Sequence, residues 1–194
     1  MDKEALNLKA FNMYGGFNQS GDEYHILNTK TPVPWCNVMA NEHFGTIVSS
    51  YGTVYSYYKN SQGFKISNWC NDWISFKQGE IFEGIYDKNY NMICGFGYTK
   101  ILQEDNDVKK ELNIFISSYE NIKIQRITLK NNGKDTKKVK ISYRIDPVMG
   151  VVKDINRNYI LCKEIENGIQ MKNPYSLEFS NCISYITVGG MSKE

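Results

Sequence analysis

The sequence contains few of the residues that build metal centres and disulfide frameworks. It has two histidines and five cysteines among 194 residues. The cysteines, at 36, 70, 94, 162 and 182, are scattered, and none belongs to a CxxC pair. Together with the histidines they lack the spacing of zinc ligands, which argues against a metal site. Free thiols in a reducing cytoplasm fit this odd, scattered set better than a disulfide framework does.

Long hydrophobic runs and an excess of one charge are also missing. The N-terminal sequence "MDKEALNLKA" has no apolar core of the kind found in a signal peptide, and no run approaches the length of a membrane span. The net charge is +2, which gives no electrostatic reason for binding nucleic acid or an anionic membrane. We therefore expect a cytoplasmic protein with neither kind of partner.

The motifs of several common enzyme classes are absent as well. No nucleophile elbow, P-loop, HExxH or serine-triad pattern occurs. The glycines of "GFG" (95–97) have no helical pattern after them, so they indicate a strand bend or bulge and not a phosphate cradle. Carboxylates are plentiful, but no acid and base pair stands out among them. Asp72 is the best placed, because aromatic residues surround it.

The residues that are present favour a folded β-domain. Hydrophobic residues make up 41% of the chain and aromatic residues 13%, which is enough for a core and too aromatic for disorder. The length suits a single domain. Helical periodicity is nearly absent, and only residues 2–10 are expected to form a short turn of helix.

Alternation with a period of two is the strongest pattern. It runs through "KVKISYRI" (138–145), which Asp146 and Pro147 then terminate, and through "LNIFI" (112–116), where Phe115 indicates a partly covered second face. In "NIKIQRITLK" (121–130) the apolar phase slips by one residue, which predicts a β-bulge.

Turn signals separate these strands at short intervals. The segment 44–58 reads as two strands around Gly52, and "ENG" (166–168) links two further strands. The basic run "KNNGKDTKKVK" (130–140) brackets an NG turn and is expected to be the solvated end of a hairpin. Short strands at regular spacing without intervening helices predict an all-β fold, an antiparallel β-sandwich.

One short stretch, "FKISNWCNDW" (64–73), combines two tryptophans with amides and a carboxylate. Flat aromatic faces beside such groups suit a sugar, whose C–H face stacks while its hydroxyl groups make directed hydrogen bonds. The same residues also suit a buried turn, because Asn and Asp bond their own backbone in turns. The residues alone leave both interpretations open.

Seven motifs follow one another along the chain in a characteristic order. They are "FNMYGGFNQSGDEYHI" (11–26), "TPVPWCNVMANEHFGTIVSSYGTVYSYYKNS" (31–61), "ISNWCND" (66–72), "GEIFEGIYD" (79–87), "GFGYT" (95–99), "LNIFISSYENIKIQRITLKNNG" (112–133) and "NPYSLEF" (173–179). Their order resembles the N-terminal β-sandwich of the inverting phosphorylases of glycoside hydrolase family 94, formerly glycosyltransferase family 36, a group with cellobiose phosphorylase, β-1,2-oligoglucan phosphorylase and cyclic β-1,2-glucan synthase.

The resemblance implies a supersandwich of the galactose-mutarotase-like kind and a non-catalytic role. In the family, the general acid and the inorganic phosphate site lie in a following (α/α) barrel, and no residue here matches that acid. We expect residues 1–194 to be a single, incomplete N-terminal-type domain with no catalytic residue, no cofactor and no metal. The implied partners are the barrel and a β-glucan or gluco-oligosaccharide. The alternative is a stand-alone carbohydrate-binding or dimerisation module.

Four departures from the family pattern stand out. Gln62, Gly63 and Phe64 replace an Arg-containing stretch, and Ser67-Asn68-Trp69 replaces Thr-Pro-Trp. A segment after Asp87 looks deleted, and Cys94 stands where a His is common. Missing strands would expose sheet edges and apolar surface, so we expect a homo-oligomer.

The candidate sugar-binding residues follow from the resemblance. "ISNWCND" is similar to the family loop that leans toward the sugar-binding cleft of the barrel. Trp69 is expected to pack at the base of this loop, and Asn71 and Asp72 to offer hydrogen bonds near a glucosyl unit. Asn60 and Tyr98 complete the candidate set. The alternative is that the residues of the loop only hold it in shape.

Overall fold

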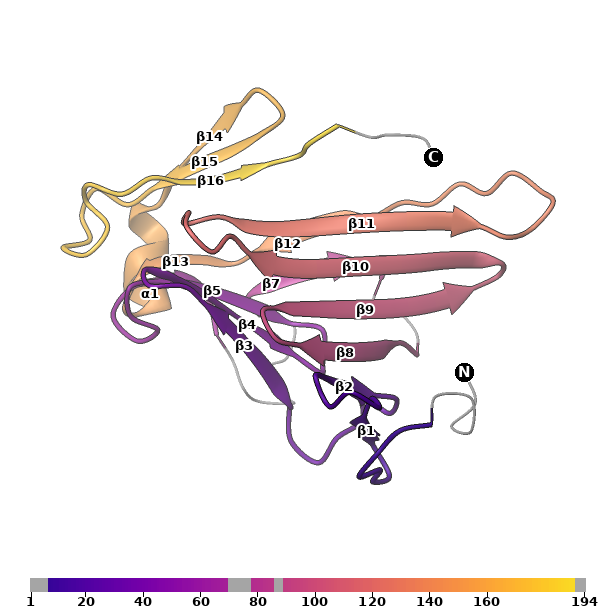
Figure 1. The fold of residues 1–194 in the computed structure, drawn as a ribbon. Helices are drawn as coiled ribbons and strands as arrows, with labels where there is room; N and C mark the ends of the chain where they lie inside the picture. The colour runs from indigo at the N-terminus through magenta and orange to yellow at the C-terminus, as the bar shows by residue number, and fades with distance from the viewer. Residues whose placement is uncertain (1–6, 70–77, 86–88, 191–194) are drawn as a thin grey trace.

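The computed structural model describes residues 7–69, 78–85 and 89–190 (Figure 1). The elements formed by these residues are β1 (Gly15–Phe17), β2 (Glu23–Ile26), β3 (Cys36–Ala40), β4 (Phe44–Ser49), β5 (Val54–Tyr58), β6 (Lys65–Ser67), β7 (Glu80–Glu83), β8 (Asn91–Gly95), β9 (Tyr98–Asp105), β10 (Val108–Ile116), β11 (Lys123–Asn131), β12 (Ser142–Ile145), β13 (Pro147–Gly150), α1 (Lys153–Asn156), the 3₁₀ turn Arg157–Tyr159, β14 (Leu161–Ile165), β15 (Gly168–Lys172) and β16 (Ser184–Thr187).

A six-stranded antiparallel sheet forms one layer. Its strand order is β1-β2-β8-β9-β10-β11, so β11 is an edge strand. In β10, Leu112 and Ile114 are fully buried, whereas Phe115 on the other face is half-buried. The alternation predicted for 112–116 is therefore confirmed.

A second, seven-stranded sheet forms the other layer. Its main path runs β12-β7-β5-β4-β3, and β6 pairs with both β5 and β13. The β4–β5 hairpin turns at Tyr51 and Gly52, as the sequence predicts for 44–58. Gly52 has φ +83°, a left-handed conformation that glycine adopts without steric cost.

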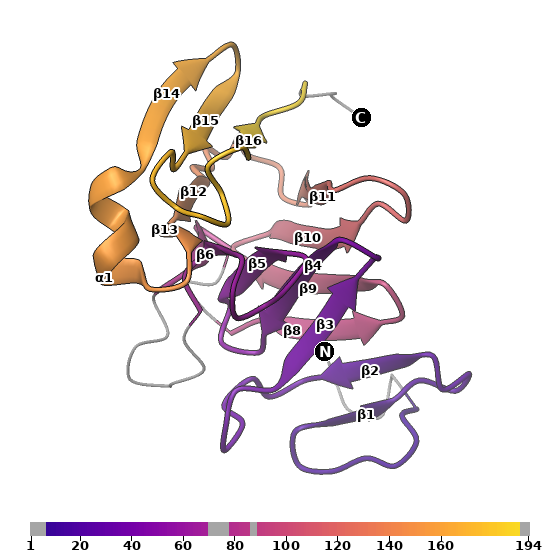
Figure 2. The same cartoon turned by 90° about the vertical axis from the view of Figure 1, so that its left-hand side faces the viewer.

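The core lies between the two sheets. Ile101 and Leu112 of the six-stranded sheet and Val48 and Val54 of the seven-stranded sheet are each 0% exposed and belong to one hydrophobic cluster. Two antiparallel sheets that share one core form a β-sandwich, as predicted. The view in Figure 2 shows the layers from the end where α1 lies.

A small third sheet, with order β14-β15-β16, lies at the opposite end of the molecule from β1 and β2 in both views (Figures 1 and 2). The predicted "ENG" turn joins β14 to β15, with Asn167 at φ +57°. This sheet attaches to the sandwich through a second cluster of Met149, Met171 and Phe179. The Asn173 side-chain amide also donates to the Met149 carbonyl oxygen over 3.0 Å.

The hairpin predicted for the basic run 130–140 is wrong. Residues 132–141 connect β11 to β12, and these strands belong to different sheets. The run is exposed over most of its length, as predicted, but it crosses from one layer to the other. The NG signal is real, since Gly133 N donates to Asn131 Oδ1 over 3.0 Å. A turn of this kind does not by itself determine which strand comes next.

The β-bulge predicted in 121–130 is also wrong. β10 and β11 pair without a register shift, from Val108 with Asn131 to Ile116 with Lys123. The apolar phase changes because β11 is an edge strand with apolar residues on both faces. Ile127 packs on the core, while Ile124 faces outward and is 41% exposed.

Other boundaries differ more modestly from the predictions. The strand predicted at 138–145 forms only from Ser142 onward. In "GFG", Gly95 ends β8, and Phe96 and Gly97 form the turn of the β8–β9 hairpin and not a bend within a strand. Residues 7–10, the described part of the helix predicted at 2–10, are not helical, and α1 was not predicted. Asp146 does separate β12 from β13. The deletion expected after Asp87 adjoins 86–88, outside the described residues.

Candidate functional site

The connection between β6 and β7 leaves the sandwich from a base that is tied by hydrogen bonds. Asn68 N donates to the Asp146 carbonyl oxygen over 2.8 Å, and Asp146 N donates to the Gly79 carbonyl oxygen over 2.9 Å. The side-chain amide of Asn68 also donates to Gln78 Oε1. Both ends of the connection are thereby held against the residue that separates β12 from β13.

Gly79 allows this close approach. Its φ is +91°, and a Cβ atom there would lie 2.7 Å from the Asn68 carbonyl oxygen and 2.8 Å from the Val54 carbonyl oxygen. These distances are shorter than real Cβ contacts, and the obstacles are backbone atoms. A side chain would therefore force the base apart.

Aromatic rings gather where the connection begins. The Trp69 ring lies 5.4 Å from that of Tyr55, and the Tyr57 ring lies 5.7 Å from that of Tyr55. Tyr55 is 1% exposed, whereas Trp69 and Tyr57 are half-buried. The Tyr57 ring occupies the space above Gly45, where a Cβ would meet it at 2.1 Å. We call Tyr55, Tyr57 and Trp69 the aromatic row.

The aromatic row lies on the outer face of β5. The neighbouring residue Ser56 faces inward, toward Lys123 of the other sheet. The Tyr55 ring is held in place, because its hydroxyl donates to the Ser61 carbonyl oxygen. Burial raises the pKa of Tyr55 well above its usual range, so the phenol keeps the proton that makes this hydrogen bond. Trp69 thus packs at the base of the connection.

A buried ion pair lies on the inner face, directly after the base. Glu80 is 1% exposed and bonds to the Lys123 ammonium, the Tyr143 hydroxyl at 2.6 Å and Ser67 Oγ at 2.9 Å. Burial alone would raise the pKa of Glu80, but the adjacent Lys123 charge and these hydrogen bonds hold it below its ordinary value. The carboxylate is therefore charged and fully partnered, and it links the two sheets.

Asn60 shapes the turn between β5 and β6. Its Oδ1 accepts hydrogen bonds from the backbone N–H groups of Gln62 and Gly63, both at 2.8 Å. This is an Asx-type turn, in which the side chain replaces a backbone acceptor. Asn60 is exposed, and its neighbour Ser61 accepts the Tyr55 hydrogen bond. The turn that Asn60 shapes is therefore tied to Tyr55, on which Trp69 also packs.

Tyr98 lies elsewhere, on the outer face of the six-stranded sheet. Its hydroxyl donates to Glu23, and the Lys100 ammonium lies 4.9 Å from the centre of its ring. The hydrogen bond to Glu23, with burial, raises the pKa of Tyr98 to about 12, and the same bond lowers the pKa of Glu23. The structure thus separates Tyr98 from Trp69 and Asn60. The other two candidates, Asn71 and Asp72, lie outside the described residues.

Comparison with known proteins places this arrangement in a family. Residues 22–82 and 83–194 match the family described as "Glycosyl hydrolase 94, supersandwich domain". The chain belongs to this family. The match includes the strands from β2 to β16 and the base of the β6–β7 connection.

Individual relatives are larger proteins. The supersandwich domain is 25% identical to the cyclic β-(1,2)-glucan synthase NdvB of Rhizobium meliloti, over 95% of this chain and 7% of the relative. It is 19% identical to the N,N'-diacetylchitobiose phosphorylases of Vibrio proteolyticus and Vibrio furnissii. Those matches cover 75% and 80% of this chain, and 21% and 22% of the two phosphorylases. The chain spans less than a quarter of the length of these relatives.

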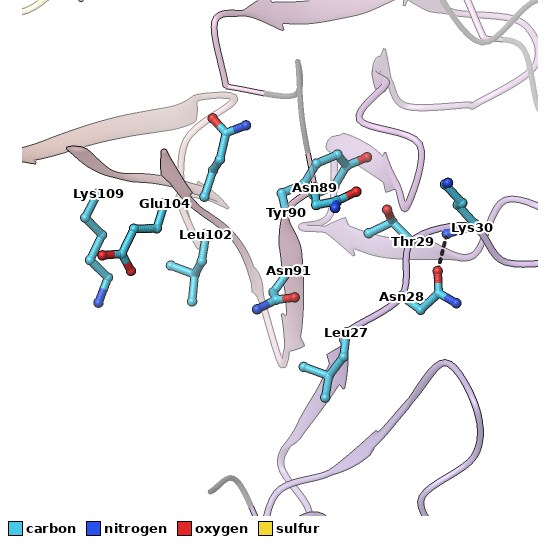
Figure 3. A pocket seen from close by; sticks show the side chains of 11 residues that line it. Leu27, Asn28, Thr29, Lys30, Asn89, Tyr90, Asn91, Leu102, Glu104 and Lys109 are labelled. Atoms are coloured by element: carbon cyan, nitrogen blue, oxygen red, sulfur yellow. Dashed lines mark hydrogen bonds between the residues drawn. The ribbon is translucent and has the colours of Figure 1, made fainter. Parts of the chain in front are cut away.

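The supersandwich domain also has a pocket that the sequence did not reveal. It is a cavity of about 600 Å³ beside β9, near the starts of β8 and β10 (Figure 3). Gln103 in its lining is 3% exposed. The sequence did contain a signal for this pocket. Gln103 is a polar residue at a buried position of β9, in phase with Thr99 and Ile101. The lining residues are Leu27, Asn28, Thr29, Lys30, Asn89, Tyr90, Asn91, Leu102, Gln103, Glu104 and Lys109.

Two further searches cover only the described ranges 7–69, 78–85 and 89–190. Within them, no group of three or more His, Cys, Asp or Glu side chains is arranged to hold a metal ion. Nor is any helix in these ranges long and apolar enough to cross a membrane.

Proposed function

We propose that this supersandwich domain is a non-catalytic accessory domain that acts beside the (α/α) barrel of a carbohydrate-active enzyme, where its β6–β7 connection contacts a gluco-oligosaccharide. Membership of the family supports the accessory role. The observation that carries the sugar contact is the aromatic row at a hydrogen-bonded base. Half-buried Trp69 and Tyr57 rings, held by buried Tyr55, offer flat faces of the kind on which sugar rings stack.

Two carboxylates of the described residues support a non-catalytic role. A general acid needs contact with the substrate and a proton to donate. Glu80 is enclosed between the sheets and is ionised beside Lys123. Glu23 accepts the hydrogen bond of Tyr98, which lowers the pKa of this carboxyl. Both carboxylates have structural partners, so we assign the chemistry to the barrel, with inorganic phosphate bound there.

Exposed apolar side chains support a partner domain. Large apolar residues on and around α1 and the third sheet are more than half exposed, far more than a solvated surface requires. We call them the C-terminal apolar residues. They are Ile155 (63%), Leu161 (61%), Tyr175 (76%), Leu177 (95%) and Val188 (73%).

Three of the described cysteines support a reducing, cytoplasmic location. Cys94, Cys162 and Cys182 are free thiols. Burial raises the pKa of the Cys94 thiol to about 12, which keeps it protonated and unreactive.

The test of the sugar contact is calorimetric titration of the chain with sophorose, a β-1,2-linked glucose disaccharide. We expect weak binding, and the part of it that comes from this contact should be abolished by Trp69→Ala and partly kept by Trp69→Phe, because phenylalanine retains a flat apolar face. Asp72→Asn should also weaken binding, with an unchanged melting temperature. The matched control is Tyr159→Ala, which removes a partly exposed ring near α1. If wild type and Trp69→Ala bind sophorose equally, the proposed contact is wrong.

The alternative function is a stand-alone carbohydrate-binding or dimerisation module. The C-terminal apolar residues favour it if they contact a second copy of the chain instead of a barrel. Sedimentation of the chain mixed with a separately expressed family barrel distinguishes the two. A stable one-to-one complex supports the accessory domain, and a homodimer that ignores the barrel supports the module.

A further inference from the structure

We infer that the pocket beside β9 is a second binding site, independent of Trp69, for an uncharged, hydroxyl-bearing molecule of one or two sugar rings. None of the residues of the aromatic row is among the residues that line this pocket. The inference rests on an unpartnered buried amide, on the neutral floor of the pocket and on the end of the β8–β9 pairing at Asn91 and Leu102.

The unpartnered amide belongs to Gln103. Its side chain is buried and lines the pocket, yet neither Nε2 nor Oε1 has a hydrogen-bond partner among the described residues. Buried polar groups in folded proteins are almost always paired, so an open amide facing a cavity indicates a group that pairs with a ligand. An amide offers both a donor and an acceptor, which matches two neighbouring hydroxyl groups.

The floor of the pocket is neutral and amphipathic. Its half-buried members are Leu27, Thr29, Tyr90, Asn91 and Leu102, which combine apolar surface with amide and hydroxyl groups. A sugar ring needs this combination, since its C–H faces pack on apolar atoms while its hydroxyl groups bond to amides.

Charges occur only at the rim among the residues that line the pocket. Lys30, Glu104 and Lys109 are exposed. In Figure 3, Glu104 and Lys109 lie on one side of Leu102, and Lys30 lies on the far side of Leu27 and Thr29. Glu104 and Lys109 are also directly opposite each other on β9 and β10, where opposite charges attract. An anion or cation would find no counter-charge on the floor, so the geometry favours an uncharged ligand.

The edge of β9 provides room for the ligand. Leu102 pairs with Asn91, the first residue of β8, but β9 continues beyond that pair to Asp105. Residues 89–90, which lead into β8, line the pocket there together with residues 27–30. The volume of about 600 Å³ is within the usual range for small-molecule sites.

The experiment follows the side-chain amide signals of Gln103 by NMR while sophorose or glucose is added to the chain. We expect the chemical shifts of these signals to change as sugar is added and to reach a plateau. Gln103→Leu should weaken sophorose binding at this site by at least about tenfold, because ligand hydroxyl groups lose their partners. It should unfold at the same temperature as wild type or higher, because leucine has no unpaired polar atoms.

Gln125→Leu is the matched control. Gln125 is also on the inner face of this sheet and has a buried Oε1 without a partner among the described residues, but it does not line the pocket. This variant should keep sophorose binding. Rim variant Asn89→Ala provides a second probe that leaves the interior untouched, and we expect it to weaken binding about threefold.

Several results would overturn the inference. If the chemical shifts of the Gln103 amide do not change with either sugar, the pocket holds only water. Signals that move with inorganic phosphate alone mean an anion site on Lys30 and Lys109. Signals that move with protein concentration instead mean a contact between copies. Trp69→Ala should leave the Gln103 response intact, so failure of this site and failure of the proposed sugar contact are distinguishable.

Discussion

At the scale of residues, the pair Glu80–Lys123 has the largest structural consequence. Both side chains are nearly withdrawn from solvent, with 1% and 9% exposed, and they come from opposite sheets. Burial of either charge alone is very unfavourable, so each depends on the other. Tyr143 and Ser67 complete the hydrogen bonds of the carboxylate. The pair therefore fixes how the two sheets meet beneath the β6–β7 connection.

Lys123→Met should lower the free energy of unfolding by roughly 3–5 kcal/mol, because it leaves the Glu80 carboxylate buried and unpaired. Urea unfolding is the measurement. The double variant Glu80→Gln/Lys123→Met should recover part of this loss, since neither charge remains. Equal destabilisation of the single and the double variant would show that the pair is not coupled.

The same pair should make the stability of the chain depend on pH. The pKa of Glu80 in the folded chain is below its ordinary value of 4.5, so folding favours the ionised form. Its contribution is fully present above about pH 4.5 and is lost as the pH falls through the folded pKa. In urea unfolding between pH 7 and pH 3, the stability of Glu80→Gln should therefore decline less steeply than that of wild type. Parallel declines would rule out this contribution.

Trp69 is half-buried against Tyr55, so its stability contribution should be intermediate. Trp69→Ala should cost about 2–3 kcal/mol, below the roughly 3–5 kcal/mol typical of a fully buried tryptophan. Thermal unfolding measures the change, with Trp69→Phe as the control that keeps part of the ring contact. A loss below about 0.5 kcal/mol would mean that the ring does not pack at the base.

At the scale of elements, the base of the β6–β7 connection depends on one glycine. Gly79→Ala should destabilise by about 2–3 kcal/mol, because a strained φ adds to the collision with two backbone carbonyl groups. Gly97→Ala is the matched control, since Gly97 has φ +80° but no atom lies within 4 Å of the point that a Cβ would occupy there. It should cost only about 1 kcal/mol. Equal losses in thermal unfolding would mean that the close approach at Gly79 is unimportant.

At the scale of the whole molecule, exposed apolar surface should make the isolated chain self-associate. Tyr175 and Leu177 are 76% and 95% exposed, and β11 is the last strand of its sheet among the described residues. Tyr175→Ser/Leu177→Ser should shift sedimentation toward the monomer at a given concentration. The control Met13→Ser, at a residue that is 68% exposed near β1, should not. A wild-type chain that remains monomeric at all concentrations would contradict this prediction.

The whole chain should also lack phosphorolysis. Incubation with sophorose or cellobiose and phosphate should release no glucose 1-phosphate, because the proposed chemistry belongs to the barrel and the carboxylates of Glu80 and Glu23 are held by structural partners. The control is the same assay after addition of a family barrel. Release that survives repurification of the chain alone would refute the non-catalytic assignment.

The sequence by itself determined the fold class and several elements. The alternation in 112–116 and the turns at Gly52 and Asn167 depend on side chains close together in the chain, so local patterns contain the information. The order of motifs also identified the family, which the match over 22–82 and 83–194 confirmed.

Tertiary structure decided what depends on distant partners. Pairing of β12 with β7 made the run at 130–140 a crossover, and the edge position of β11 allowed apolar residues on both faces without a bulge. The same holds for the sites. Tyr98 was separated from Trp69 because Tyr98 is in β9 of one sheet and Trp69 follows β6 of the other. Gln103 lines a pocket to which residues as far apart as 27 and 109 contribute. Side-chain periodicity specifies which face of a strand is buried, but not which distant segment will cover it.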